Sequence, residues 1–168
     1  MQAIIDSCDT YCQRAEDYFE RSFLRPQIRV DLRGQAAGQA NLSRALLRFN
    51  PILYQENRQH FLRHTVGHEV AHWIAYSLYG SVRAHGREWQ QIMTDVFDLR
   101  AERLHHYNTQ SVIGPTYTYH CHCRTHQLTK RRHKAIQKGL VYCCRACQGT
   151  LTLATHSLLP IQTTFIKE

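Results

Sequence analysis

Residues 59–80 read QHFLRHTVGHEVAHWIAYSLYG, and their pattern decides the fold of the surrounding region. No proline interrupts residues 55–79. Within this stretch, side chains recur at intervals of three or four residues along one helical line, at Phe61, Thr65, His68, His72 and Tyr76. This periodicity predicts a helix over residues 55–79 that ends at Gly80.

The middle of this helix carries His68-Glu69-Val70-Ala71-His72, an HExxH motif. Two histidines four residues apart project from one face of a helix and can reach one metal ion, with the glutamate beside the open coordination position. Zinc with three protein ligands lowers the pKa of its bound water to about 7, and a neighbouring carboxylate can accept the proton. We therefore predict a catalytic zinc site in which His68 and His72 are ligands and Glu69 is the general base of amide hydrolysis.

The third ligand of such a site must come from another element. His85 follows the break at Gly80 and starts the next predicted helix, and Gly86 beside it permits close approach of the backbone. The rival ligands are carboxylates, at Glu88, Asp95 and Asp98. We prefer His85, because Glu88 and Asp95 would share the helix surface with the buried stripe around Trp89.

Helices and short strands are expected around this motif. Apolar spacing predicts a first helix over residues 4–24, stopped by Pro26, with an inner stripe of Ile4, Cys8, Tyr11, Cys12, Ala15, Tyr18 and Phe19. The two cysteines of this stripe are expected to be core thiols rather than ligands. Alternating apolar residues predict a strand over residues 28–32, and residues 45–49 form a second plausible strand before a turn at Asn50-Pro51.

The helix that starts at His85-Gly86 is expected to extend to residue 97. Its inner face carries large apolar side chains, at Trp89, Ile92, Met93, Val96 and Phe97. The sequence therefore predicts an α+β fold, with a mainly helical domain and a small antiparallel sheet.

The distribution of charge changes near residue 115. Residues 1–115 carry 13 arginines, no lysine and 12 acidic residues, whereas residues 116–168 carry eight lysines and arginines and one acidic residue. Almost all of the formal net charge of +8 therefore resides in the last third of the chain. Together with the Gly114-Pro115 dipeptide, this change predicts one domain over residues 1–115 and a basic module over 116–168.

Five of the seven cysteines lie in the basic module. Two pairs, Cys121-x-Cys123 and Cys144-x-x-Cys147, frame a 20-residue insert and could close a tetrahedral structural zinc site. A segment too small to form its own core would need such a metal, so we predict a zinc ribbon. Because the first pair departs from the usual spacing, His126 and Cys143 remain alternative ligands.

The insert between the cysteine pairs is rich in cations, at Lys130, Arg131, Arg132, Lys134 and Lys138. Such residues can contact phosphates. Three tyrosines lie nearby in the sequence, Tyr117, Tyr119 and Tyr142, and exposed tyrosine rings can stack on unpaired bases. The run therefore predicts binding of DNA or another nucleic acid with weak sequence selectivity. A solvated basic face is the alternative interpretation.

The cysteine count and the apolar runs also indicate where the protein is located. Seven is an odd number, and the opening residues lack the order of a signal peptide. Apolar runs are far shorter than the 18 residues that a membrane-spanning helix needs. We therefore expect a cytoplasmic protein with no membrane partner, in which clustered cysteines bind metal.

Together these features resemble the SprT family of zinc metallopeptidase-like proteins. The residues that carry the resemblance are Asn50-Pro51, the HExxH motif, His85-Gly86 followed by Trp89, and the cysteine region between residues 119 and 151. The resemblance covers almost the whole chain.

This resemblance implies a zincin-like domain in which His68, His72 and His85 bind zinc and Glu69 is the catalytic base. It also implies a protein substrate. The eukaryotic Spartan proteins, similar in this core, degrade proteins crosslinked to DNA, so the resemblance extends the expected substrates to nucleic-acid-associated or DNA-crosslinked proteins. A donor for the oxyanion is not identifiable from the sequence, although Tyr76 and the arginines are candidates.

Two hypotheses of function follow. In the first, the chain is a zinc metalloendopeptidase with one catalytic and one structural zinc ion. In the second, it is a nucleic-acid-binding zinc-ribbon protein whose HExxH site is structural or inactive. The intact motif favours the first hypothesis, because a purely structural site has no need for Glu69.

Overall fold

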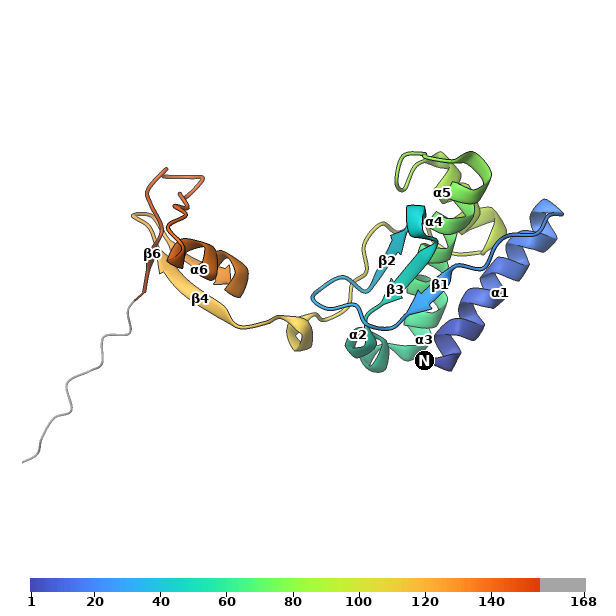
Figure 1. Ribbon diagram of the computed structural model, residues 1–168, viewed down its shortest axis with the longest axis horizontal. Helices are drawn as coiled ribbons and strands as arrows, with labels where there is room; N and C mark the ends of the chain where they lie inside the picture. The colour runs from blue at the N-terminus through green and yellow to red at the C-terminus, as the bar shows by residue number, and fades with distance from the viewer. Residues whose placement is uncertain (155–168) are drawn as a thin grey trace, which may run out of the picture. The chain divides into compact units, whose positions relative to one another are not determined.

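A computed structural model of the protein describes residues 1–154. The chain forms two compact units, Met1–Ile113 and Gly114–Glu168 (Figure 1). Residues 155–168 complete the expected basic module and include Lys167 and Glu168, and they lie outside the described residues. Helices, small sheets and a cysteine cluster near the C-terminus confirm the α+β fold with a zinc-ribbon-like module.

The first unit contains most of the helices. Its elements are α1 (Gln2–Phe19), β1 (Gln27–Arg29), β2 (Gly38–Asn41), β3 (Leu46–Phe49), α2 (Pro51–Glu56), α3 (Arg58–His60), α4 (Val66–Tyr79) and α5 (Arg87–Gln91). Two π-helical segments, η2 (Phe61–Thr65) and η3 (Ile92–Val96), and two short 3₁₀ turns, η1 (Leu42–Arg44) and η4 (Gln110–Val112), connect them. No helix within residues 1–154 is long and apolar enough to cross a membrane.

Helix α1 packs against α4 and carries the predicted buried stripe. Five residues of that stripe are buried, Ile4, Cys8, Tyr11, Cys12 and Ala15. The expectation was wrong for Tyr18, which is 56% exposed near the end of the helix. Because both cysteines lie in the core, burial raises the pKa of their thiols, that of Cys12 to about 11.

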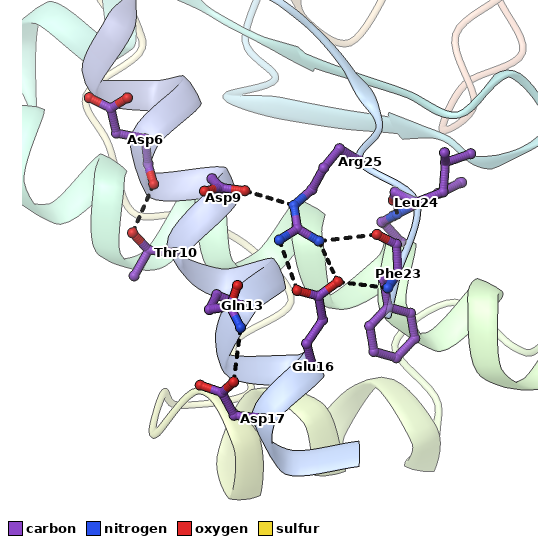
Figure 2. Close-up of polar contacts among 10 residues, drawn as sticks. Asp6, Asp9, Thr10, Gln13, Glu16, Asp17, Phe23, Leu24 and Arg25 are labelled. Carbon is purple, nitrogen blue, oxygen red and sulfur yellow. Dashed lines mark hydrogen bonds and ion pairs between the residues drawn. The ribbon is translucent and has the colours of Figure 1, made fainter. Parts of the chain in front are cut away.

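The end of α1 also differs from the prediction. The helix stops at Glu20, whose backbone is left-handed with φ 51°, six residues before Pro26. The Arg25 guanidinium then joins the following segment to α1 through ion pairs of 2.7 Å to Asp9 and 2.7 Å to Glu16 (Figure 2). Glu16 also accepts a hydrogen bond from the Phe23 amide, and these bonds lower its pKa to about 2. The helix therefore ends at its own left-handed cap and not at Pro26, and the ion pairs hold the following segment against the helix.

The sheet of the first unit is mixed, with strand order β1-β3-β2. Strand β2 pairs antiparallel with β3, as expected for a small antiparallel sheet, but β1 pairs parallel with β3. The expectation of a wholly antiparallel sheet was wrong here, because the chain crosses from β1 on one edge of β3 to β2 on the other instead of making a tight turn. The sequence of β2, Gly-Gln-Ala-Asn, lacks apolar alternation, and this edge strand was therefore not predicted.

The predicted helix over 55–79 is confirmed from residue 58 onward, because α3, the π-helical η2 and α4 follow one another without a break, and Asn57 separates them from α2. Asn50 caps α2, because its side-chain oxygen accepts hydrogen bonds from the amides of Ile52 at 3.0 Å and Leu53 at 3.3 Å, and Pro51 occupies the first helical turn. The expected turn at Asn50-Pro51 is thus a helix start. The π-helical η2 precedes α4, which ends at Gly80 as predicted.

The next predicted helix is also present, as α5 followed without a break by the π-helical η3, and its inner face is buried as expected. Trp89, Ile92, Met93 and Phe97 are each 1% exposed. These side chains pack into the same core as α1 and α4. The structure thus holds the segment that follows His85 firmly against the motif helix.

Within residues 114–154, the second unit contains a three-stranded antiparallel sheet and one helix. Its strands are β4 (Thr116–His120), β5 (Thr125–Thr129) and β6 (Thr152–Leu153), in the order β5-β4-β6, and α6 (Lys130–Gln137) follows β5. Its small core consists of Tyr119, Leu128, Cys144 and Leu151. So few apolar side chains are a weak basis for independent stability.

Candidate metal centres

The structure brings the three predicted histidines of the first unit together. Helix α4 presents His68 and His72 on one face, and the turn after α4 brings His85 to them. The Nε2 atoms lie 3.2 Å apart for His68 and His72, 3.1 Å for His72 and His85, and 3.0 Å for His85 and His68. Among residues 1–154, the group contains none of the rival carboxylates.

The geometry of the three nitrogens fits a single zinc ion. Tetrahedral zinc with Zn–N bonds of about 2.0–2.1 Å separates its ligand nitrogens by about 3.3–3.4 Å, close to the distances found here. Burial, and then the neighbouring histidines, lower the pKa of His68 to about 4 and that of His72 to about 3. These imidazoles are therefore neutral at pH 7, the form that donates a lone pair to a metal. The group could hold a metal ion.

The backbone of His85 adopts an uncommon conformation that orients its ring. Its φ is 57°, in the left-handed region, and the amide of Gly86 donates a 2.8 Å hydrogen bond to the carbonyl of Arg83. A side chain at Gly86 would lie 2.8 Å from that carbonyl oxygen, so glycine permits the tight turn. Strained residues of this kind are characteristic of ligand sites.

Trp89 lies against all three histidines. Its ring centroid is 4.8 Å from that of His68, 5.4 Å from that of His72 and 4.8 Å from that of His85. Its indole N–H donates a 3.2 Å hydrogen bond to the carbonyl of His68. The sequence indicated only that Trp89 is buried. Its position shortly after His85, at the start of the next helix, was the only signal for this contact.

We predict that metal binding quenches the fluorescence of Trp89. In a Trp73→Phe variant, where Trp89 is the remaining tryptophan, Co²⁺ added to the metal-free protein should remove most of the emission, because the ion is held by rings that contact the indole. Titration of emission against Co²⁺ measures this effect. The matched control is Trp89→Phe, in which Trp73 should respond weakly. Equal quenching in both variants would place the ion elsewhere.

Glu69 is buried beside the histidines, against the edge strand β2. It is 7% exposed, and a Cβ atom added at Gly38 would lie 2.5 Å from its Oε1. Burial raises the pKa of Glu69 to about 8, although a backbone hydrogen bond at Ala40 acts in the opposite direction. A carboxyl group with this pKa can both accept and release a proton near neutral pH.

A cavity of about 600 Å³ opens onto Glu69 and the three histidines. Strand β2 lines it through Gly38 and Ala40, and the irregular segment over residues 100–107 contributes further side chains, Arg100, Glu102, Arg103, Leu104, His105 and Tyr107. Of the candidates for an oxyanion donor, arginines line this cavity whereas Tyr76 does not. The volume is in the range of ordinary ligand sites.

Sequence reasoning missed the segment over residues 100–107, because it has no periodic pattern. The Tyr107 hydroxyl lies 3.0 Å from His60 Nδ1 and 2.9 Å from Thr65 Oγ1, and His105 Nε2 lies 3.0 Å from the carbonyl of Gln35. These hydrogen bonds fix the segment as one wall of the cavity.

The structure also brings four cysteines of the second unit together, Cys121, Cys123, Cys144 and Cys147, with sulfur atoms within 4.8 Å of one another. The Sγ atoms of Cys121 and Cys123 are 3.5 Å apart, and those of Cys123 and Cys144 are 3.7 Å apart. Tetrahedral zinc with Zn–S bonds of about 2.3 Å separates its sulfurs by about 3.8 Å, so this group too could hold the ion.

The two alternative ligands lie outside this group. Cys143 is exposed, and its backbone forms an isolated bridge with Thr150. His126 Nε2 lies 3.2 Å from the sulfur of Cys121 but does not belong to the group of four. His126 is therefore placed to hydrogen-bond to a ligand sulfur rather than to replace it.

The predicted basic residues lie on or beside α6, and all are exposed. At 3.6 residues per turn, four of these side chains fall within about 100° of the helix surface, namely Lys130, Arg131, Lys134 and Lys138. Arg132 lies about 150° from the centre of this group. We call these four residues the basic stripe. The structure thus separates Arg132 from the other cations of the run.

The tyrosines of the second unit are less available than expected. Tyr119 is 1% exposed, and its hydroxyl lies 2.9 Å from His133 Nδ1. Tyr117 stacks on His133, with ring centroids 3.7 Å apart and an interplanar angle of 2°. The expectation of exposed stacking side chains was wrong for Tyr119, because the small core of this unit requires its ring.

Comparisons with known proteins agree with this arrangement. Residues 8–110 match the model of the SprT-like family. Protein SprT of Pseudomonas paraeruginosa (strain DSM 24068 / PA7) is 45% identical over 158 residues, which cover 92% of this chain and 94% of that protein. Protein SprT of Actinobacillus succinogenes (strain ATCC 55618 / DSM 22257 / CCUG 43843 / 130Z) is 45% identical over 140 residues, 83% of this chain and 82% of that protein. No solved structure matches the chain.

Proposed function

The chain belongs to the SprT-like family, and on this basis we propose that it is a zinc-dependent metalloendopeptidase that hydrolyses protein substrates. One observation supports this most directly. Three neutral imidazoles converge within 3.2 Å of one another, and the glutamate between two of them lines the same cavity. A structural metal site would need neither this carboxyl group nor an open cavity.

The residues of the cavity suggest how an amide bond is cleaved. Zinc held by His68, His72 and His85 would polarise the scissile carbonyl and acidify a water molecule. Glu69 would accept a proton from the attacking water and give it to the amine nitrogen as the bond breaks.

The proposal is tested by incubating the zinc-loaded protein with an unstructured protein and with a DNA-crosslinked protein, each with and without DNA. We expect zinc-dependent cleavage that a chelator abolishes and zinc restores. If the fully loaded protein binds DNA but cleaves neither substrate, the alternative is supported, a nucleic-acid-binding protein with an inactive HExxH site.

We predict that Gly38→Ala impairs cleavage without loss of metal. The new methyl group would lie within 2.8 Å of three Glu69 side-chain atoms, so the carboxyl group must move away from Gly38 and out of its position beside the histidines. Misplacement of a general base should reduce kcat by about 100-fold, whereas zinc content should be unchanged. Steady-state kinetics and metal analysis measure both.

The control for this substitution is Gly114→Ala, since nothing lies within 4 Å of a Cβ atom there. Full activity of Gly38→Ala would contradict the inferred position of Glu69 in catalysis.

For the second unit, we propose a structural zinc ion bound by the four cysteines and nucleic-acid binding by the basic stripe. The stripe gathers four exposed cations on one helical face, and no acidic residue lies within residues 116–154. Such a surface would recruit the protein to substrates that are associated with, or crosslinked to, DNA. The proposal places the protein in the cytoplasm, where its thiols stay reduced.

Charge removal from the stripe should weaken DNA binding and its dependence on salt. In the double variant Arg131→Ala, Lys134→Ala we expect the slope of log K against log salt to fall by roughly 1–2, because each lost phosphate contact contributes about 0.9 for duplex DNA. Fluorescence anisotropy at several salt concentrations gives the slope. Arg132→Ala is the matched control. A larger effect of Arg132→Ala than of the double variant would exclude the stripe as the binding surface.

A further inference from the structure

A second hollow, of about 490 Å³, lies beside the catalytic cavity. His64 and Arg100 line both, so the two spaces are neighbours within the first unit. The second hollow is further lined by Arg63, Thr94 and Asp98. Nothing in the proposed mechanism uses these side chains.

The two arginines of this hollow have no anionic partner. Among residues 1–154, the ion pairs of the first unit involve only Arg25 and Arg48, and neither Arg63 nor Arg100 forms a side-chain hydrogen bond. The Asp98 carboxylate lines the same hollow but lies more than 4.0 Å from both guanidinium groups, since no ion pair forms. Both guanidinium groups are therefore free to pair with an incoming anion.

For a substrate that runs along the motif helix, the hollow would lie about two residues from the reacting bond. His64 precedes His68 by four residues, which is about 6 Å along a helix. An extended peptide advances about 3.3 Å per residue. A peptide bound with its scissile bond at the histidine group would therefore place a side chain at this hollow about two residues away.

We propose that Arg63, His64 and Arg100 form a carboxylate subsite that selects protein substrates with Asp or Glu about two residues from the cleaved bond. This inference rests on the proposed peptidase function. Two guanidinium groups and an imidazole suit a single carboxylate, which arginine binds through paired N–H donors. An extended nucleic acid fits less well, because its successive phosphates would meet Asp98 and Glu102, which line the two hollows, whereas a single side-chain carboxylate can pair with the arginines alone.

The test uses the full-length, zinc-loaded protein and internally quenched peptides that carry Glu, Gln or Lys at positions two residues before or after the cleaved bond. We expect kcat/KM for the Glu peptide to exceed that for the Gln peptide by about tenfold at low salt. Arg63→Gln and Arg100→Gln should reduce this ratio towards one, and Arg100→Glu should favour the Lys peptide. Arg44→Gln is the matched control, since Arg44 is exposed and lines neither hollow.

Cleavage of Glu and Gln peptides with equal kcat/KM would overturn the subsite and leave the peptidase proposal intact. If no peptide is cleaved, the peptidase proposal fails, and the subsite is judged by anisotropy of labelled peptides bound to zinc-loaded Glu69→Gln protein. Equal binding of the Glu and Gln peptides would then overturn the proposed subsite. Loss of single-stranded oligonucleotide binding in Arg63→Gln and Arg100→Gln, without a change in peptide preference, would overturn it in favour of a nucleic-acid contact.

Discussion

Replacement of Glu69 by glutamine is expected to reduce kcat for protein cleavage by about a thousandfold, within the range that general acid–base groups contribute. Glutamine has nearly the same shape, so the packing against Gly38 should persist, but an amide cannot accept the proton of the attacking water. The zinc content should therefore remain that of the wild-type protein. Cleavage rates and metal analysis on the same preparation measure both quantities.

Two variants make this result specific. Glu88→Gln changes a carboxylate of α5 that does not line the cavity, and it should retain activity. His85→Ala removes one of the three converging imidazoles and should lose one zinc ion together with activity. Substantial cleavage by zinc-loaded Glu69→Gln would mean that another group accepts the proton.

Cys144→Ser should release one of two zinc ions and unfold the second unit. Structural zinc contributes roughly 10–16 kcal/mol to the folding of zinc-finger peptides. The core of this unit is small, so its apolar contacts cannot replace that contribution. We therefore expect loss of nucleic-acid binding and rapid proteolysis beyond residue 114, whereas cleavage of an unstructured substrate should persist. Zinc stoichiometry and limited proteolysis provide the measurements.

The neighbouring Cys143 provides the matched control, because it is exposed and lies outside the group of four. Cys143→Ser should keep two zinc ions and a protease-resistant second unit. The reverse pattern, with zinc lost from Cys143→Ser and kept in Cys144→Ser, would show that the two cysteines had been assigned the wrong way round.

Much of the fold was predictable because it follows from local spacing. Apolar periodicity identified the buried faces of α1 and of the segment after His85, and Gly80 marked the end of α4. The π-helical turn η2 inside the predicted 55–79 helix was not predictable, because such turns leave no clear signal in residue type. Strand β2 was missed because its pairing with β3, rather than its own residues, makes it a strand.

The sequence by itself determined which chemistry is available: two histidines and a glutamate on one helical turn, two cysteine pairs, and a basic run. Only the tertiary structure decided which of the distant candidates meet them. It brought His85, rather than the nearby carboxylates, to the motif, and it placed Glu69 against Gly38. The physical reason is that contacts within one helical turn depend on backbone geometry alone. Contacts across 13 to 31 residues depend on how the whole core packs.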